Sequence, residues 1–249
     1  MRTDQIALQL YTVRDLAAAD LPGTLAGVAA AGYRAVELAG LPDMPARDLG
    51  QLLAVAGLRP IASHEAIGRL RDDPAAVADR LEVVGCPRVV VPWMPEADRR
   101  TVDDVRRFAS ELGVLAGRFA DRGIAVGYHN HAFEFTPLAG TTVWAVLLDE
   151  LPAGVELELD VYWLSVGGRD PVTEIRAVAD RVRLLHMKDR AAGPDVRDAP
   201  AGAGILPFPA IVDAAQSAGV EWYVAEQDDP LDALADIAAA ARYLASIAD

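Results

Sequence analysis

Short apolar runs recur along the whole chain, and longer runs with a helical period separate them. A short run rich in β-branched residues predicts a strand, and a longer run with apolar residues every three to four positions predicts an amphipathic helix. The expected strands cover residues 6–13, 33–38, 58–63, 88–93, 124–131, 155–163, 182–188 and 222–227. The expected helices cover residues 21–31, 45–56, 73–84, 101–122, 143–150, a stretch that starts at 171, 210–218 and 231–247. These strand–helix units predict an α/β fold, a single (βα)8 TIM barrel formed by residues 1–249 as one domain.

Several expected strands finish in a side chain that can bind a metal ion. VELELDVYW carries Asp160 near its end, VRLLHMKD carries His186, and WYVAEQ carries Glu226. The chain has 4 histidines, and all of them fall at or just beyond an expected strand end: His64, His129, His131 and His186. Because the carboxyl ends of the strands of a parallel barrel meet at one mouth, we expect these side chains to converge there.

A carboxylate at the end of a buried strand costs free energy unless a cation or a proton lies beside it. Taken one at a time, Asp160, His186 and Glu226 can also be explained as helix caps or members of surface ion pairs. Taken together, they favour one shared cation. A set of oxygen and nitrogen donors without thiolates suits Mn²⁺, Mg²⁺, Co²⁺ or Zn²⁺.

Charge and cysteine content restrict the partners and the compartment. The chain has 23 Lys and Arg against 37 Asp and Glu, a net charge of −14, which repels nucleic acid and anionic membrane surfaces. The one cysteine, Cys86, lies in an apolar run and predicts a buried thiol in a reducing compartment. No stretch has the pattern of a signal peptide or the length of a membrane span. We therefore expect a cytoplasmic protein without nucleic-acid or membrane partners.

Four segments carry a family resemblance. YHNHAFEF, LELDVYWLSVGGRDP, LLHMKDR and VAEQDDP, in this order, resemble the successive signatures of the sugar phosphate isomerase/epimerase family, the xylose isomerase-like TIM barrels. The resemblance implies one divalent metal ion, Mn²⁺ ahead of Mg²⁺, Co²⁺ and Zn²⁺. The implied ligands are Glu134, Asp160, His186 and Glu226. Many relatives carry the first of these glutamates at the place where this chain has His129, so His129 is the alternative to Glu134.

The resemblance also implies a reaction, that of a metal-dependent sugar isomerase or epimerase. A carbon next to a carbonyl loses a proton when a metal ion stabilises the developing enediolate. Glu134 and Glu226 are the expected pair that removes and returns this proton. The expected substrate is a small sugar or cyclitol without a phosphate group, because few basic residues lie near the expected mouth. The residues expected to contact it are His64, Trp93, His129, His131, Trp163 and Lys188, and the two tryptophans can equally pack in the core or at the rim.

Other functions stay open on the sequence. A dehydratase or lyase of the same family, similar to inosose dehydratase or acting on a 3-keto sugar or glycoside, would form the same enediolate and then lose a β-substituent. A non-catalytic barrel that binds a sugar would need no metal. A DNA-repair endonuclease of the related barrel type would need a basic face, which the charge of −14 argues against. Relatives often have Gly-Glu-Gly where this chain has Gly202, Ala203 and Gly204, and they often form dimers or tetramers, for which the sequence identifies no interface.

Overall fold

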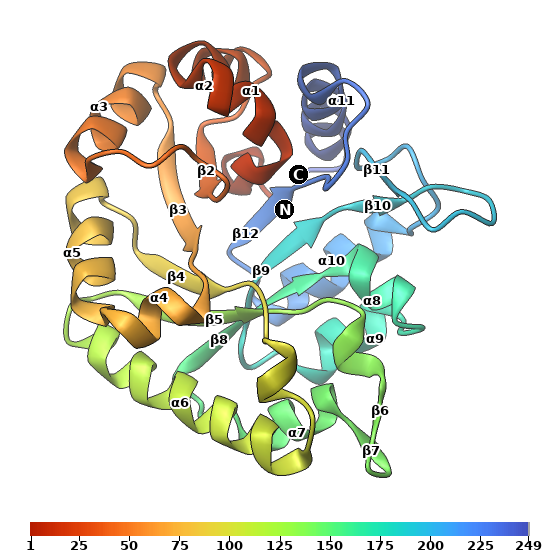
Figure 1. Ribbon diagram of the computed structural model, residues 1–249. Helices are drawn as coiled ribbons and strands as arrows, with labels where there is room; N and C mark the ends of the chain where they lie inside the picture. Colours follow the sequence, from red (N-terminus) through yellow and green to blue (C-terminus); the bar gives the residue numbers. More distant parts are fainter. Residues whose placement is uncertain (249) are drawn as a thin grey trace.

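The computed structural model describes residues 1–248, and its central feature is a closed barrel of parallel strands (Figure 1). Around the barrel the order is β1, β2, β3, β4, β5, β8, β9 and β12, and β12 pairs with β1. The barrel strands are β1 (Ile6–Gln9), β2 (Ala35–Leu38), β3 (Arg59–His64), β4 (Arg88–Val91), β5 (Ala125–His129), β8 (Val155–Asp160), β9 (Val182–Met187) and β12 (Trp222–Ala225). The predicted TIM barrel is therefore confirmed.

Helices surround the barrel, as Figure 1 shows. They are α1 (Arg14–Ala19), α2 (Leu21–Ala30), α3 (Ala46–Ala56), α4 (Ile67–Asp72), α5 (Pro74–Val84), α6 (Val102–Ala120), α7 (Val143–Glu150), α8 (Val161–Val166), α9 (Pro171–Ala177), α10 (Phe208–Ala218) and α11 (Ala233–Ser246). Several begin at side-chain caps that the sequence predicts. Thr101 accepts the N–H of Asp104 at 3.1 Å and thereby fixes the start of α6.

Most barrel strands end earlier than expected at the mouth, because the chain turns there, whereas β2 ends at Leu38 as expected and β3 extends one residue further, to His64. Val161 to Trp163, expected as strand, form the first turn of α8. The reason is local, since Asp160 Oδ1 accepts the N–H of Trp163 at 2.9 Å and caps this helix. In the same way the chain leaves β1 through a 3₁₀ helix, η2 (Leu10–Val13), instead of continuing as strand. The short helices α1 and α4 are likewise additions to the expected pattern.

The interior of the barrel divides into an apolar lower layer and a polar upper layer. The lower layer packs Ala7, Ala35, Ile61, Ala62, Val90, Leu184 and Val224. Nearer the carboxyl ends of the strands, buried polar side chains replace them: Gln9, Glu37, His129, Glu158, Asp160 and His186. Side chains two apart on a strand share a face, so one face of β8 carries Glu156, Glu158 and Asp160 in a row from the lower end to the mouth.

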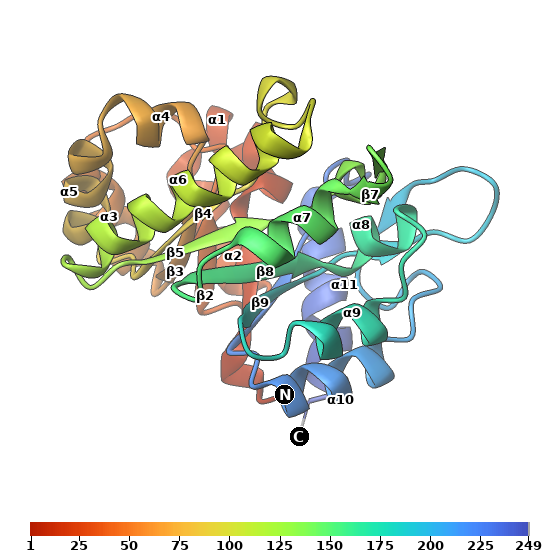
Figure 2. The same cartoon turned by 90° about the horizontal axis from the view of Figure 1, so that it is seen from below.

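An aspartate organises the long loop after β9. Two short strands, β10 (Asp189–Arg190) and β11 (Asp198–Ala199), pair there, and the segment between them projects from the barrel (Figure 2). The Asp189 carboxylate accepts the N–H groups of Gly202 at 3.1 Å and Gly204 at 2.8 Å. A Cβ at Gly204 would lie 2.2 Å from a backbone oxygen, so the chain approaches too closely for any other residue. These glycines therefore have a structural role that does not depend on Ala203.

A second antiparallel pair, β6 (Pro137–Leu138) and β7 (Thr141–Thr142), lies between β5 and α7.

Cys86 is buried, as predicted, and burial raises the pKa of its thiol to about 12. Such a thiol stays protonated at neutral pH and is a poor nucleophile. Within residues 1–248, no helix combines the length and the apolar character that crossing a membrane requires.

Candidate active site

Three predicted metal-binding side chains converge at the mouth of the barrel. One ligand atom from each of Asp160, His186 and Glu226 lies within 4.8 Å of the other two, and all three residues are buried. His186 Nδ1 is 2.8 Å from Glu226 Oε2. We refer to these three residues as the metal group. Their convergence is the outcome that the strand-end pattern predicted.

Backbone contacts hold Asp160 in place. It is the last residue of β8, and its N–H donates to Asn130 Oδ1 at 3.1 Å. Its Oδ1 accepts the N–H of Trp163, as described above, while Oδ2 is buried and accepts no hydrogen bond. One oxygen therefore organises the chain, and the other faces the site.

A second cluster lies against the first and shares His186. Ligand atoms of His64, His129, Glu158 and His186 also lie within 4.8 Å of one another. Glu158 Oε2 is at the centre, 2.7 Å from His64 Nε2, 3.0 Å from His129 Nδ1 and 3.2 Å from His186 Nε2. We refer to these four residues as the histidine group. Of the 4 histidines predicted to converge, three contact this one carboxylate oxygen.

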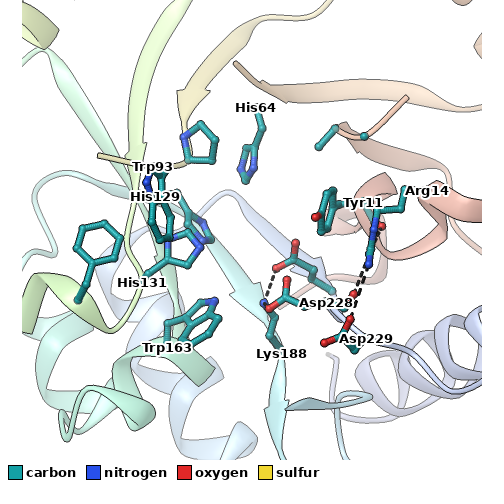
Figure 3. A pocket seen from close by; sticks show the side chains of 15 residues that line it. Tyr11, Arg14, His64, Trp93, His129, His131, Trp163, Lys188, Asp228 and Asp229 are labelled. Carbon is teal, nitrogen blue, oxygen red and sulfur yellow. Dashed lines mark hydrogen bonds and ion pairs between the residues drawn. The ribbon is translucent and has the colours of Figure 1, made fainter. Parts of the chain in front are cut away.

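The fourth histidine, His131, belongs to an aromatic wall. Its ring centroid lies 4.9 Å from that of Trp93, 5.9 Å from that of Phe133 and 5.3 Å from that of Trp163. Burial lowers the pKa of His131 to about 2, so the imidazole is neutral at physiological pH. In Figure 3 this wall faces Tyr11, Arg14 and Asp228 across the cavity.

The structure adds polar residues that the sequence analysis missed. Glu37, on β2, is fully buried, and its Oε2 lies 2.7 Å from His186 Nε2 and accepts a hydrogen bond from Gln9 Nε2 at 2.9 Å. Asp228, two residues beyond Glu226, pairs with Lys188. Asp160 was identified as an acid at the end of an apolar strand, and Glu37 stands near the end of the apolar strand AVEL, so the same criterion applied to β2 would have found it.

Lys188 is an internal cation among the acids of the mouth. Its Nζ lies 2.7 Å from Asp228 Oδ2, 3.0 Å from Glu226 Oε2 and 3.4 Å from Asp160 Oδ2. Burial opposes its charge, yet these three carboxylates hold the pKa of Lys188 well above its usual value. The side chain also lines the cavity, where the sequence analysis expected it to meet the substrate.

Burial controls the ionisation of the acids. It raises the pKa of Asp160 to about 7, although Lys188 opposes the shift. For Glu226 burial acts in the same direction, but Lys188 and His186 outweigh it and hold the pKa well below its usual value. Burial also lowers the pKa of His129 to about 4, which keeps this imidazole neutral and able to act as a ligand.

The donor atoms fit a divalent cation. Asp160 Oδ2 of the metal group and Glu158 Oε1 of the histidine group are buried and accept no hydrogen bond. Carboxylate oxygens buried in this way are costly unless a cation neutralises them. Both groups contain only oxygen and nitrogen donors, the set that suits Mn²⁺, Mg²⁺, Co²⁺ or Zn²⁺. The buried cluster is thus consistent with a divalent metal site.

Glu134, the first ligand implied by the resemblance, lies outside both groups. It is fully buried in the 3₁₀ helix η4 (Phe133–Phe135). Its Oε1 accepts the hydroxyl of Tyr128 at 2.6 Å, and its Oε2 accepts the N–H of His131 at 2.9 Å. Burial raises its pKa to about 8. By contrast, His129 Nε2 is 4.0 Å from Asp160 Oδ2.

A cavity of about 770 Å³ opens at the mouth of the barrel, and Figure 3 shows side chains that line it. This volume is in the range of small-molecule binding sites. All six residues predicted to contact the substrate line it: His64, Trp93, His129, His131, Trp163 and Lys188. Glu226 of the metal group also lines it, so the predicted substrate contacts and the metal group share one cavity.

Residues 25–247 match the xylose isomerase-like TIM barrel family, and the chain belongs to this family. Among solved structures, a sugar phosphate isomerase/epimerase from Parabacteroides distasonis is 26% identical, with a TM-score of 0.84, over 96% of this chain and 96% of that one. A zinc-bound IOLI protein is 15% identical, with a TM-score of 0.74, over 98% of this chain and 97% of that one, which is a likeness of fold.

Among curated proteins, an inosose dehydratase from Lacticaseibacillus casei is 28% identical over 157 residues, which are 53% of this chain and 50% of the relative. The match thus spans about half the length of that curated relative. The chain is similar both to an isomerase/epimerase and to a dehydratase, and the family relationship alone does not choose between these reactions.

Proposed function

We propose that this protein is a metal-dependent sugar isomerase or epimerase that works by proton abstraction next to a carbonyl. The observation that carries the proposal is the convergence of Asp160, His186 and Glu226 within 4.8 Å, with Glu226 lining the cavity. The similarity over nearly the full length to a sugar phosphate isomerase/epimerase supports it. Convergence of this kind at the carboxyl ends of barrel strands is typical of an active site rather than of a stabilising core.

The ion would be held by the metal group and by His129 as the fourth ligand. His129 Nδ1 lies 3.0 Å from Glu158 Oε2, which favours a proton on Nδ1 and leaves the lone pair of Nε2 facing Asp160. Glu134 is less suited, because both of its oxygens already accept hydrogen bonds. When bound, a divalent ion supplies Lewis-acid stabilisation of negative charge on neighbouring substrate oxygens.

Glu226 is the proposed base. Its contacts with His186 and Lys188 use Oε2, which leaves Oε1 to take the proton from the substrate carbon. Its low pKa keeps it ionised at neutral pH. Of the two glutamates in the expected pair, only Glu226 lines the cavity, whereas Glu134 is enclosed by Tyr128 and His131. One base suffices for aldose–ketose exchange, because the same carboxylate can return the proton to the neighbouring carbon, and epimerisation needs a second group on the opposite face. The geometry therefore favours isomerisation.

The charges around the cavity favour a sugar without a phosphate group. Two cations line it, Arg14 and Lys188. Lys188 is paired with buried acids, and Arg14 donates to the carbonyl oxygen of Asp228 at 2.7 Å. The lining also contains three acids, which repel a phosphate dianion: Glu226, Asp228 and Asp229.

The test is solvent exchange. Protein loaded with Mn²⁺ is incubated in D₂O with unphosphorylated aldoses and ketoses, and the products are followed by NMR. We expect deuterium at the carbon next to the carbonyl without loss of water. Glu226→Gln should abolish this exchange, while Glu221→Gln, which changes a 46% exposed side chain just before β12, should preserve it. Absence of exchange with every sugar would contradict the proposal.

A dehydratase is the second candidate, because a curated relative that the chain matches over part of its length is an inosose dehydratase. In that case Glu226 would take the same proton and pass it to the β-hydroxyl, which would leave as water while the Lys188 ammonium hydrogen-bonds to its oxygen. The same experiment separates the two reactions. Loss of one water molecule from an inosose or another keto sugar would favour the dehydratase.

A further inference from the structure

Glu37 is a buried acid on a strand that supplies no residue to the metal group. It lies on β2, and its side chain is fully buried inside the barrel. Its Oε2 accepts from Gln9 Nε2 at 2.9 Å and lies 2.7 Å from His186 Nε2. Its Oε1 is 3.3 Å from His64 Nε2 and accepts no hydrogen bond. Glu37 therefore lies between Gln9, on β1, and His186, on β9, and contacts both.

His186 presents its two ring nitrogens to different surroundings. Nδ1 faces Glu226 Oε2 at 2.8 Å, on the side of the metal group, and Nε2 faces Glu37 on the opposite side. A ring nitrogen binds a metal ion only through its lone pair, and the proton must then sit on the other nitrogen. A carboxylate that accepts from this second nitrogen fixes both the tautomer and the orientation of the ring.

Two carboxylates are close enough to His186 Nε2 to do this, and Glu37 is the better placed. Its distance is 2.7 Å, against 3.2 Å for Glu158 Oε2. The same oxygen of Glu158 is also 2.7 Å from His64 and 3.0 Å from His129, so it is shared among three imidazoles. Glu37 Oε2 has no such competition, and Gln9 holds it in position.

We propose that Glu37 is the positioning residue of the metal site: it keeps the proton of His186 on Nε2, so that Nδ1 is free to bind the ion. This inference rests on the proposed metal-dependent function. Glu37 itself touches neither the ion nor the substrate, and its effect reaches the site through His186. Gln9 acts one step further away, by orienting the Glu37 carboxylate.

The first test is metal affinity, measured by calorimetric titration of metal-free protein with Mn²⁺. We expect Glu37→Gln to bind Mn²⁺ about 10- to 100-fold more weakly than the wild type, the usual loss for such a partner of a ligand histidine. The matched control is Glu174→Gln. Glu174 is also a buried acid, 3% exposed, but it accepts from Trp144 Nε1 at 3.1 Å and from Arg169, away from the site. Its variant should bind Mn²⁺ within about twofold of the wild type.

The second test does not require a buried substitution to be tolerated at position 37. Gln9→Ala leaves Glu37 and His186 intact but frees the carboxylate, and we expect a smaller loss of Mn²⁺ affinity, about threefold to tenfold. ¹⁵N NMR of histidine-labelled protein loaded with diamagnetic Zn²⁺ reports the tautomer directly. The wild type should show His186 protonated at Nε2, and the Gln9 variant should show this proton signal broadened or shifted.

The outcomes separate this inference from the proposed function. A wild type that binds neither Mn²⁺ nor Zn²⁺ contradicts the metal site itself. A wild type that binds Mn²⁺, together with unchanged affinity in both the Glu37 and Gln9 variants, overturns the role of Glu37 and leaves the proposed function intact. A Zn²⁺-loaded wild type with the His186 proton on Nδ1 overturns it as well.

Discussion

Strand β8 carries three acids on one face, and their surroundings differ between the two ends of the barrel. At the lower end Glu156, 23% exposed, pairs with Arg88 at 2.8 Å. In the middle Glu158 is fully buried among imidazoles, and at the mouth Asp160 is fully buried with one oxygen that accepts no hydrogen bond. Acids on the same strand thus have different roles: Glu156 forms an ion pair with Arg88 at the lower end, and Asp160 belongs to a candidate metal site at the mouth.

The cavities at the two ends reinforce this contrast. The cavity at the lower end measures about 790 Å³ and the one at the mouth about 770 Å³. At the lower end the charged side chains have ordinary partners, such as Arg88 with Glu156 and Arg59 over the ring of Trp222. Size therefore does not distinguish a functional cavity. What distinguishes the mouth is buried charge without a complete set of partners, which is costly for folding and useful for binding a cation.

The largest difference should appear in metal affinity when Asp160→Asn is compared with Glu156→Gln. The asparagine keeps the oxygen that caps α8 but loses the anionic donor, so we expect Mn²⁺ affinity to fall about a thousandfold, or about 4 kcal/mol. The Glu156 variant should bind Mn²⁺ as the wild type does. Calorimetric titration measures both, and equal affinities in the two variants would remove the contrast between the ends.

The second difference concerns stability. Glu158→Gln removes the negative charge that three histidines share inside the barrel, and we expect about 3 kcal/mol less free energy of unfolding at pH 7. Glu156→Gln breaks a pair near the surface and should lose less than about 1 kcal/mol. Urea denaturation of the metal-free proteins tests this. Equal losses of free energy of unfolding in the two variants would show that Glu158 contributes no more to stability than Glu156 does.

A third prediction uses the pH dependence of Glu134, a buried acid whose carboxyl accepts hydrogen bonds from Tyr128 and from the N–H of His131. Its pKa is about 8 in the folded protein and close to 4.5 when unfolded, so the folded state binds the extra proton between these values. The contribution of Glu134 to the free energy of unfolding therefore falls as pH rises from 4.5 to 8, and this loss is complete above pH 8. The glutamine of Glu134→Gln does not titrate, so the variant does not undergo this loss. We expect it to be about 2 kcal/mol more stable than the wild type at pH 8.5 but not at pH 5.

Urea denaturation at pH 5 and pH 8.5 measures the difference. Glu156→Gln is the control, because it changes an acid that pairs with Arg88 at the lower end of the barrel and leaves Glu134 in place. A Glu134 variant whose stability follows the wild type at both pH values would show that this carboxyl does not titrate in the proposed way.

The smallest effect is expected from the aromatic wall. Trp93 is 46% exposed at the rim of the upper cavity, where a ring face can pack against a sugar. Trp93→Ala should raise KM about fivefold, or about 1 kcal/mol, with kcat unchanged. Trp222→Ala, at the lower end, should leave KM unchanged. Steady-state kinetics with the substrate found by the exchange experiment decides, and an equal effect of both substitutions would contradict the assignment of the upper cavity.

Local patterns explain why much of the fold was predictable. The alternation of β8, the cap at Thr101 and the left-handed glycine at position 57, with φ of 69°, are set by neighbouring residues. The ends of the strands were less predictable, because two short-range preferences compete there. In VELELDVYW the β-rich composition favours a strand through Trp163, and the capping carboxylate of Asp160 ends it three residues earlier.

The site was predictable only in part, for a related reason. Asp160, His186 and Glu226 each stand at the end of an apolar strand, and parallel strands bring such ends together. Glu134 illustrates where this reasoning ends. It lies beyond its strand, in a 3₁₀ turn that directs the carboxyl toward Tyr128, and no spacing rule specifies that direction.

The sequence by itself determined the eight strand–helix units and the side chains that stand at the strand ends, because both depend on residues close together in the chain. Only the tertiary structure decided which of those side chains meet. Glu37 and His186 are 149 positions apart, and their contact at 2.7 Å follows from the closure and register of the barrel. Closure also decided which charges lost their water, and this loss of solvation separates Asp160 from Glu156 on the same strand.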